Sequence, residues 1–289
     1  MARRPIPAME PTKSAKPAQT WSCIRGGCVD VLQGIAKKHP DGLFDMMFAD
    51  PPYFLSNGGI TCQNGRMVSV DKGGWDRSRG PETNHRFNLE WLEACREALK
   101  PNGTIWVSGT HHVIHSVGYA MQCLGMKVLN NVTWEKPNPP PNLSCRYFTH
   151  STETLLWAAK SLRSKHQFNY ELMKEANGGK QMKSVWRFLP PEAWEKGHGK
   201  HPTQKPVSLL KRIIEASTAP GEYVCDPFMG SGTTGVAAKL LGRRFLGIEI
   251  SSEYVELSRR RIQQVDAAGS NIDEQEVRAG VLHLGLEPA

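Results

Sequence analysis

The chain alternates short apolar runs with longer segments in which apolar residues recur every three or four positions. The short runs predict buried strands, and the longer segments predict amphipathic helices. We expect strands over 44–49, 104–108, 127–134, 154–158, 223–225 and 244–250, and helices over 87–99, 111–124, 207–217, 233–241 and 252–264. This alternation is typical of an α/β fold with a doubly wound, mostly parallel sheet and helices on both faces.

Both ends and one internal stretch depart from this pattern. Residues 1–20 are rich in Pro, Ala, Lys and Arg without an apolar period, which predicts a disordered tail. Residues 266–289 form a weakly patterned C-terminal tail, apart from a short strand expected over 281–284. Residues 21–265 between the tails are expected to form one domain. Within it, 160–200 predict an insertion, because charge, Gly and aromatic residues replace the apolar period.

Composition narrows the class of protein only in part. The chain has 36 Lys and Arg residues against 28 Asp and Glu, a formal net charge of +8. That excess suits a polyanionic partner such as nucleic acid, although a merely basic protein would show it too. Seven scattered cysteines without a Cys-x-x-Cys pair predict free thiols in a reducing compartment. Because no apolar run reaches the length of a membrane span and 1–20 lack a signal-peptide core, we expect a cytoplasmic protein with no membrane partner.

The first candidate for chemistry is Asp50-Pro51-Pro52-Tyr53, which directly follows the strand predicted over 44–49. Doubly wound sheets place their chemistry at the carboxyl ends of strands. The Asp50 carboxylate and a carbonyl of the Pro51-Pro52 pair, held by fixed φ angles, can accept both N–H groups of an aromatic amine. Tyr53 offers a flat face on which an extruded base can stack. An ordinary turn is the alternative interpretation, because Asp-Pro and Pro-Pro are common turn dipeptides.

The second candidate is a strand, a glycine turn and a helix start over Cys225-Asp226-Pro227-Phe228-Met229-Gly230-Ser231-Gly232-Thr233. Gly230 and Gly232 let the backbone approach a ligand closely, and the helix that follows favours a carboxylate at its N-terminus. One strand later, Glu249 is placed to accept the two ribose hydroxyls of an adenosine. No Gly-Lys-Ser/Thr sequence follows the turn, so it is not a P-loop.

With both motifs in this order, the chain resembles the beta-class amino-methyltransferases, whose DPPY motif precedes an F-x-G-x-G cofactor motif. The resemblance implies a Rossmann-like class I methyltransferase fold with seven strands and a circularly permuted motif order. It also implies S-adenosyl-L-methionine as the cofactor. The family's segment before the glycine turn is matched by His201-Pro202-Thr203-Gln204-Lys205-Pro206, so Thr203 and Lys205 are implied to hold the cofactor carboxylate. The segment Gly27-Cys28-Val29-Asp30 looks like the element that lines the cofactor's adenine, which carries the role to Cys28 and Asp30. The remaining cofactor-binding residues implied by the motifs are Asp226, Phe228, Gly230, Ser231, Gly232, Thr233, Glu249 and Ile250.

Three further segments resemble the DpnA type of adenine methyltransferase, which acts on GATC: residues 54–59, 69–76 and 142–148. The resemblance implies transfer to the N6 amine of adenine in duplex DNA, and it extends to single-stranded DNA and to a homodimer. The family places target recognition in the region of 160–200, whose mixture of basic and aromatic residues suits contacts with phosphates and bases. Residues 56–75 are polar and Gly-rich, which suits a lid over the extruded base.

Several other interpretations were weighed. His111, His112 and His115 lie within one predicted helix, but no further ligand completes a metal set, so no metal site is expected. Arg259-Arg260-Arg261 is expected to be a solvated helix face, with phosphate contact as the alternative. Carbon-5 cytosine methylation needs a nucleophilic cysteine, typically after proline, and the chain has no Pro-Cys pair. Methylation of cytosine N4, of an RNA or protein amine, or DNA binding without catalysis remain as alternatives.

Overall fold

The computed structural model describes residues 20–56, 60–63, 66–69, 74–199 and 201–268. Most of the two predicted tails, including the strand expected over 281–284, lies outside these residues, as do several residues of the segment predicted to be a lid. The main sheet contains β1 (Trp21–Arg25), β2 (Phe44–Ala49), β5 (Leu99–Gly109), β6 (Lys127–Glu135), β7 (Thr152–Ala159), β8 (Val185–Arg187), β9 (Tyr223–Asp226) and β10 (Arg244–Glu249). Two short strands, β3 (Ile60–Gln63) and β4 (Arg66–Ser69), form a separate antiparallel hairpin.

The sheet is mostly parallel, and its strand order is β1-β10-β9-β2-β5-β7-β6-β8. Only β7 runs antiparallel to its neighbours, β5 and β6. The α/β fold with a mostly parallel sheet is therefore confirmed, with one strand more than the seven expected. Two strands of the sheet, β1 and β8, lie outside the six ranges predicted from the apolar pattern, and β8 is three residues from the predicted insertion that pair with the end of β6. Its alternating exposed, buried and exposed residues are too few to stand out in the sequence.

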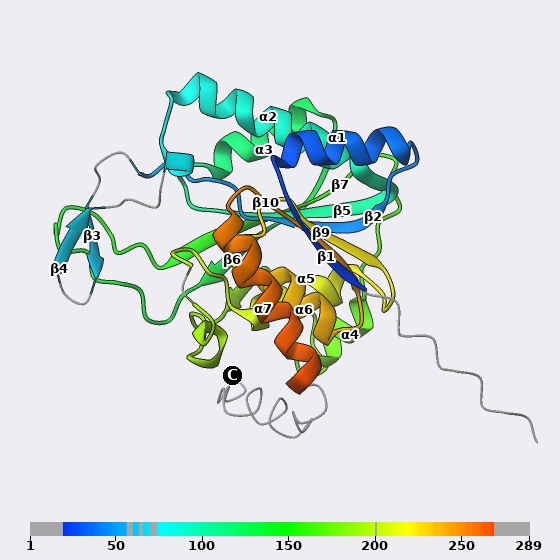
Figure 1. The fold of residues 1–289 in the computed structure, drawn as a ribbon. Coiled ribbons are helices and arrows are strands. Elements are labelled where there is room, and N and C mark those ends of the chain that lie inside the picture. The colour runs from blue at the N-terminus through cyan, green and yellow to red at the C-terminus, as the bar shows by residue number, and fades with distance from the viewer. Residues whose placement is uncertain (1–19, 57–59, 64–65, 70–73, 200, 269–289) are drawn as a thin grey trace, which may run out of the picture.

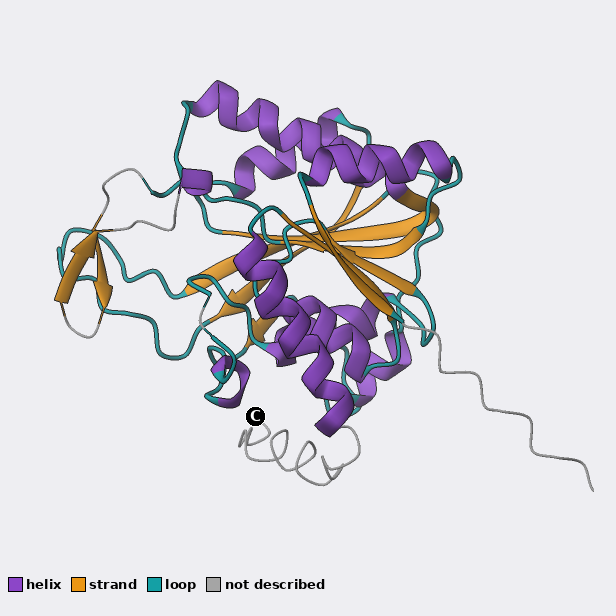
Figure 2. Ribbon diagram, in the orientation of Figure 1, coloured by secondary structure: helices purple, strands orange, loops and turns teal. Residues whose placement is uncertain are grey.

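Helices cover both faces of the sheet (Figures 1 and 2). One face carries α1 (Cys28–Lys38), α2 (Pro81–Ala98) and α3 (Ile114–Cys123). The other face carries α4 (Tyr170–Glu175), α5 (Val207–Ser217), α6 (Thr233–Leu240) and α7 (Ser252–Ala268). Two short 3-10 turns, η1 (Gly74–Asp76) and η2 (Trp194–Lys196), complete the described elements. None of these helices is long and apolar enough to cross a membrane.

Two helix boundaries differ from the predictions for local reasons. Helix α2 begins at Pro81, six residues before the predicted start at Phe87, because Gly80 at φ 95° and a proline at the first helical position start it. The residues of its first turns are polar, so the apolar pattern could not predict them as helical. Helix α3 begins only at Ile114, so His111 and His112 precede the helix that was expected to contain them.

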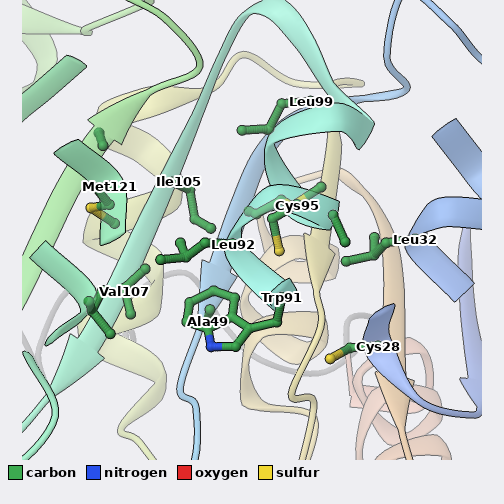
Figure 3. Close-up of a cluster of buried hydrophobic side chains, with 14 of the residues drawn as sticks. Cys28, Leu32, Ala49, Trp91, Leu92, Cys95, Leu99, Ile105, Val107 and Met121 are labelled. Atoms are coloured by element: carbon green, nitrogen blue, oxygen red, sulfur yellow. The ribbon is translucent and has the colours of Figure 1, made fainter. Parts of the chain in front are cut away.

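The sheet has a hydrophobic core on each face. In β2, Met47 and Ala49 face one core while Met46 and Phe48 face the other, so this central strand is apolar from Met46 to Ala49. Figure 3 shows part of the first core, where α2 lies against the sheet. There the fully buried Trp91 packs with residues from α1, α2, β2 and β5, including Cys28, Leu32, Ala49, Leu92, Cys95, Leu99, Ile105 and Val107. Because these strands are packed on both faces, they can hold side chains at their carboxyl ends in fixed positions, as a functional site requires.

The central strands β2 and β9 form the switch point of the sheet. They pair with each other in parallel, and their carboxyl ends lie at the same edge. After β2 the chain passes to α2 on one face, whereas after β9 it passes to α6 on the other face. A crevice forms where the connections diverge in this way, and ligands bind there in open α/β sheets.

Candidate functional site

A cavity of about 480 Å³ lies at the carboxyl ends of β2, β9 and β10. Its lining brings together every predicted site residue except Gly232: Cys28, Asp30, Asp50, Pro51, Pro52, Tyr53, Thr203, Lys205, Asp226, Phe228, Gly230, Ser231, Thr233, Glu249 and Ile250. These residues come from five separate stretches of the sequence. The two candidate motifs therefore face one shared space, as a reaction between two bound molecules requires.

Asp50 stands at the end of β2 with both carboxylate oxygens engaged. Its Oδ1 accepts hydrogen bonds from the hydroxyls of Tyr53 at 2.6 Å and Ser108 at 2.5 Å. Its Oδ2 accepts one from Lys205 Nζ at 2.6 Å. Burial alone would raise the pKa of Asp50, but the attraction and hydrogen bond of Lys205, helped by the two hydroxyls, lower it below its ordinary value. Asp50 is therefore an ionised acceptor at neutral pH.

Lys205 holds a position that the sequence did not predict. The resemblance gave it the cofactor carboxylate, whereas here its ammonium pairs with Asp50 and lies 3.6 Å from Glu153 Oε2. Burial lowers the pKa of Lys205, but Asp50 and Glu153 together raise it above its ordinary value. Opposite shifts in the two partners describe one ionised pair, nearly excluded from solvent.

Glu153 and Lys136 extend this network and were missed by the sequence analysis. Glu153, on β7, forms an ion pair with Lys136 and lies 3.5 Å from the Tyr53 hydroxyl. Burial and the nearby carboxylates of Asp50 and Glu153 raise the pKa of Tyr53 well above its ordinary value, so it stays a neutral donor. Two acids and two lysines thus balance charge behind the cavity. Their sequence separation left no local pattern that could have revealed them.

Asp76 supports the turn that carries Tyr53. It is fully buried, and its Oδ1 accepts the backbone N–H groups of Tyr53 at 2.9 Å and Phe54 at 2.8 Å. Its Oδ2 accepts the N–H of Leu55 at 3.2 Å and the hydroxyl of Ser56 at 2.9 Å. Phe54 has φ 59°, a left-handed conformation that an ordinary side chain needs such support to keep. The sequence placed Asp76 only at the end of a segment of resemblance, without a role.

The glycine turn is braced from behind by α7. Gly230 and Gly232 have φ of 50° and 75°, and a Cβ on Gly232 would lie 2.8 Å from the Ser258 side chain. The Ser258 hydroxyl also donates to the Gly230 carbonyl at 2.7 Å. Gly232 therefore does not line the cavity; it lets the turn pack against α7.

Arg261 is the second brace and corrects the expectation of a solvated arginine face. Its side chain is buried and donates to the Ser231 carbonyl at 2.5 Å and to the Thr233 hydroxyl at 3.1 Å. Arg259 pairs with Glu256, and Arg260 is exposed, as that expectation had it. Of the three arginines, Arg261 alone contacts the turn, from the same helix as Ser258.

Glu249, at the end of β10, is held by two backbone donors. Its Oε2 accepts the Gly230 N–H and its Oε1 accepts the Ser251 N–H, each at 2.9 Å. A carboxylate has about four acceptor sites, so each oxygen keeps one site toward the cavity. This fits a ligand that presents a pair of hydroxyl groups.

The rest of the lining fits the other parts of S-adenosyl-L-methionine. The first turn of α6, from Thr233, presents the positive end of the helix dipole to the cavity, where a carboxylate is favoured. Phe228 and Ile250 supply apolar surface beside Glu249 for a flat base. Cys28, whose burial raises the pKa of its thiol to about 11, adds a neutral wall at the start of α1. The donor set therefore matches the cofactor that the resemblance implies.

Asp226 lies buried between the two motifs. It accepts hydrogen bonds from Thr234 Oγ1 at 2.5 Å and from the Phe228 N–H at 3.0 Å. Burial, together with repulsion from Asp50 and Glu249, raises the pKa of Asp226 to about 7 despite those two donors. This carboxyl group therefore changes charge near neutral pH.

Asp226→Asn is expected to flatten the dependence of folding stability on pH. The folded pKa is raised, so the stability that Asp226 contributes is fully present below its unfolded pKa of about 4 and is lost as pH rises toward 7. Denaturant unfolding of the cofactor-free protein at pH 5 and pH 8 measures this. The wild type should lose on the order of 2 kcal/mol or more relative to the variant. An identical pH slope in both proteins would contradict the prediction.

The predicted recognition segment is divided between two ends of the sheet. Its first part lies at the amino end of β5, where Ser164 donates to the Pro101 carbonyl at 2.6 Å. Asn169 Nδ2 donates to the carbonyl of Glu215 at the end of α5, at 2.6 Å. Its last part lies at the cavity end, where Glu195 accepts the Val207 N–H at 2.9 Å. Ser164 and Asn169 therefore lie at the end of the sheet away from the cavity, whereas Glu195 lies near it.

Comparisons with known proteins agree with this geometry. A family model described as DNA methylase matches residues 44–260. The chain is 57% identical over 235 residues to the type II methyltransferase M2.DpnII of Streptococcus pneumoniae, covering 81% of this chain and 87% of that protein. It is 48% identical over 260 residues to the type II methyltransferase M2.MboI of Moraxella bovis, covering 90% and 94%. A crystal structure of an M1.HpyAVI–SAM complex superposes with a TM-score of 0.61 at 26% identity, covering 84% of this chain and 98% of that one. The cytosine-N4-specific PvuII methyltransferase shares the fold, with a TM-score of 0.66 at 18% identity and coverage of 90% and 91%.

Proposed function

Because the chain belongs to the DNA methylase family and is an S-adenosylmethionine-dependent DNA methyltransferase, we propose that it methylates the N6 amine of adenine. The observation that carries this proposal is the ionised Asp50 at the mouth of the same cavity as the glycine turn and Glu249. The cofactor supplies an electrophilic methyl group. The protein must orient the adenine amine so that its lone pair can attack that methyl group.

The amine of adenine is a poor nucleophile because its lone pair is delocalised into the ring. Acceptors that bind its two N–H groups bias the nitrogen toward a tetrahedral form and aim the lone pair at the methyl group. Asp50 Oδ1 already accepts two hydroxyls, whereas Oδ2 accepts only Lys205. The open acceptor site on Oδ2 is therefore the one we assign to the amine. A carbonyl of Pro51 or Pro52, both of which line the cavity, is assigned the second N–H.

The cofactor-binding roles follow the same cavity. We assign the ribose hydroxyls to Glu249, the amino-acid end of the cofactor to Gly230 and Thr203, and the adenine ring to the wall near Cys28. Lys205 lines the same cavity, but its ammonium pairs with Asp50 and Glu153, so we assign it to the catalytic network. Tyr53 lines the cavity with its hydroxyl fixed by Asp50, which leaves its ring edge and face to meet the flipped base. The transfer is direct, with no covalent enzyme intermediate.

Methyl transfer from labelled S-adenosylmethionine to unmethylated duplex DNA tests the proposal. We expect N6-methyladenine after digestion to nucleosides, confined to duplexes that contain GATC, because the resemblance to the DpnA type extends over three segments. A duplex with the central adenine of GATC replaced is the matched control. Methyl groups on cytosine N4 would keep the cofactor and the fold but overturn the proposed target.

The same resemblance extends the proposal to single-stranded DNA as a second substrate and to a homodimer. Sedimentation of the protein with and without DNA measures the dimer. A cytoplasmic location is proposed as well, since the six described cysteines are free thiols.

A further inference from the structure

Residues 136–151 form an extended segment, here called the arm, that begins at Lys136 in the network of Asp50, Lys205, Glu153 and Lys136. The backbone N–H of Lys136 donates to the Ser151 carbonyl at 2.7 Å and closes the base of the arm. The Lys136–Glu153 ion pair lies at the same point, and Glu153 in turn lies 3.5 Å from the Tyr53 hydroxyl. In Figure 1 the arm extends to the same side of the molecule as the β3–β4 hairpin that follows Tyr53.

The conformation of the arm is fixed by its own residues. Four prolines over 137–141 restrict φ along its first half. Asn142 then organises its tip: its Nδ2 donates to the Tyr147 carbonyl at 2.6 Å, and its Oδ1 accepts the Ser144 N–H at 3.0 Å. A segment fixed in this way loses little entropy when it binds a partner.

The tip presents aromatic side chains to solvent. Phe148 is 95% exposed and Tyr147 is 60% exposed. Tyr147 lies 5.3 Å from His150, which stacks at 4.8 Å on His111 from the turn after β5. The rings of Tyr147, His150 and His111 therefore support one another, and Phe148 projects beside them. A phenyl ring held almost fully in water is unfavourable relative to a buried one.

The chemistry of the arm fits a nucleic acid better than a protein. It carries Lys136 and Arg146 with one histidine, His150, and two aromatic residues, Tyr147 and Phe148, and no acidic residue occurs between Lys136 and Glu153. Basic and aromatic side chains together are the composition of surfaces that track phosphates and stack on bases. The arm begins at the Lys136–Glu153 ion pair, and Glu153 lies 3.5 Å from the hydroxyl of Tyr53, which lines the cavity.

We propose that the arm binds the duplex substrate and that Phe148 inserts into the base stack, filling the space that the extruded adenine leaves. This inference rests on the proposed function, since it assumes that an adenine is flipped out of duplex DNA. Extrusion costs a few kcal/mol of pairing and stacking, and an apolar wedge offsets part of that cost.

Phe148→Ala tests the wedge, and Leu162→Ala is the matched control, because Leu162 is also exposed, at 73%, but follows β7 at the other end of the sheet. Single-turnover methyl transfer is measured on a fully paired GATC duplex and on one with the target adenine opposite an abasic site. Phe148→Ala should slow transfer about tenfold on the paired duplex and restore it to within about threefold of wild type on the abasic one. With 2-aminopurine at the target position, the fluorescence rise on binding should be lost in Phe148→Ala and kept in Leu162→Ala.

Two results would overturn the wedge. One is a Phe148→Ala protein that matches Leu162→Ala on both duplexes and in fluorescence. The other is equal slowing on paired and abasic duplexes, which indicates a structural role for the arm. A wild-type protein that gives neither N6-methyladenine nor a fluorescence rise would instead refute the proposed function, and the wedge with it.

Discussion

Asp50→Ala is expected to abolish methyl transfer, lowering its rate by at least about a thousandfold, while the protein still binds S-adenosylmethionine. The variant removes the acceptor that aims the amine, and no neighbouring group replaces it: Tyr53, Ser108 and Lys205 all donate to Asp50. Cofactor binding should persist because the hydrogen-bond partners of the Asp50 side chain are Tyr53, Ser108 and Lys205, and neither the glycine turn after β9 nor Glu249 at the end of β10 is among them. Single-turnover methyl transfer and calorimetric titration of the cofactor measure the two parts.

The loss must be separated from a loss of fold. Removing one member of a buried ion pair is costly when the other is left unpaired. Here Lys205 keeps Glu153 at 3.6 Å, so the ammonium retains a counter-charge in Asp50→Ala. Asp50→Asn is the milder companion, because it keeps an oxygen acceptor and the shape of the side chain. Thermal unfolding should show both variants folded. Normal turnover in a folded Asp50→Ala protein would refute the catalytic assignment.

The sequence could predict features that depend on residues close together in the chain. Asp50, Tyr53, the glycine turn and Glu249 each follow an apolar strand by a fixed number of residues, and a parallel sheet brings such strand ends together. The structure places all these residues around one cavity, apart from Gly232 behind the turn. The apolar period also predicted helix α5 to the residue, because its amphipathic pattern is uninterrupted over Val207–Ser217.

What the sequence could not predict depends on distant contacts. Glu153 is 100 residues from the Tyr53 hydroxyl it approaches, and Arg261 is 30 residues from the Ser231 carbonyl it supports. An acid in a strand or an arginine in a helix carries no local sign of such a partner. Composition also does not place a segment in space. The basic and aromatic residues of 160–200 predicted target recognition, and this stays a prediction; the hydrogen bonds of Ser164 and Asn169 hold the first part of the segment at the opposite end of the sheet from the cavity.

The second prediction concerns Asp76, which holds the turn that carries Tyr53. Asp76→Ala is expected to lower kcat/KM by about a hundredfold with cofactor affinity unchanged, although Asp76 touches neither substrate in our assignment. The variant leaves the N–H groups of Tyr53, Phe54 and Leu55 without their shared acceptor. The left-handed conformation of Phe54 is then no longer stabilised, and we expect the turn to relax and to move Tyr53 away from Asp50.

Two variants make the Asp76 prediction specific. Asp76→Asn keeps one oxygen for the N–H groups of Tyr53 and Phe54, so its kcat/KM should fall between wild type and Asp76→Ala. Asp41→Ala removes an exposed carboxylate from the turn before β2 and should change neither activity nor stability measurably. Steady-state methyl transfer and cofactor titration on the three proteins decide the matter. If Asp76→Ala bound the cofactor normally and had the same kcat/KM as Asp41→Ala, the prediction would be wrong. That result would show that the hydrogen bonds of Asp76 to the Tyr53 turn do not contribute to the positioning on which the rate of transfer depends.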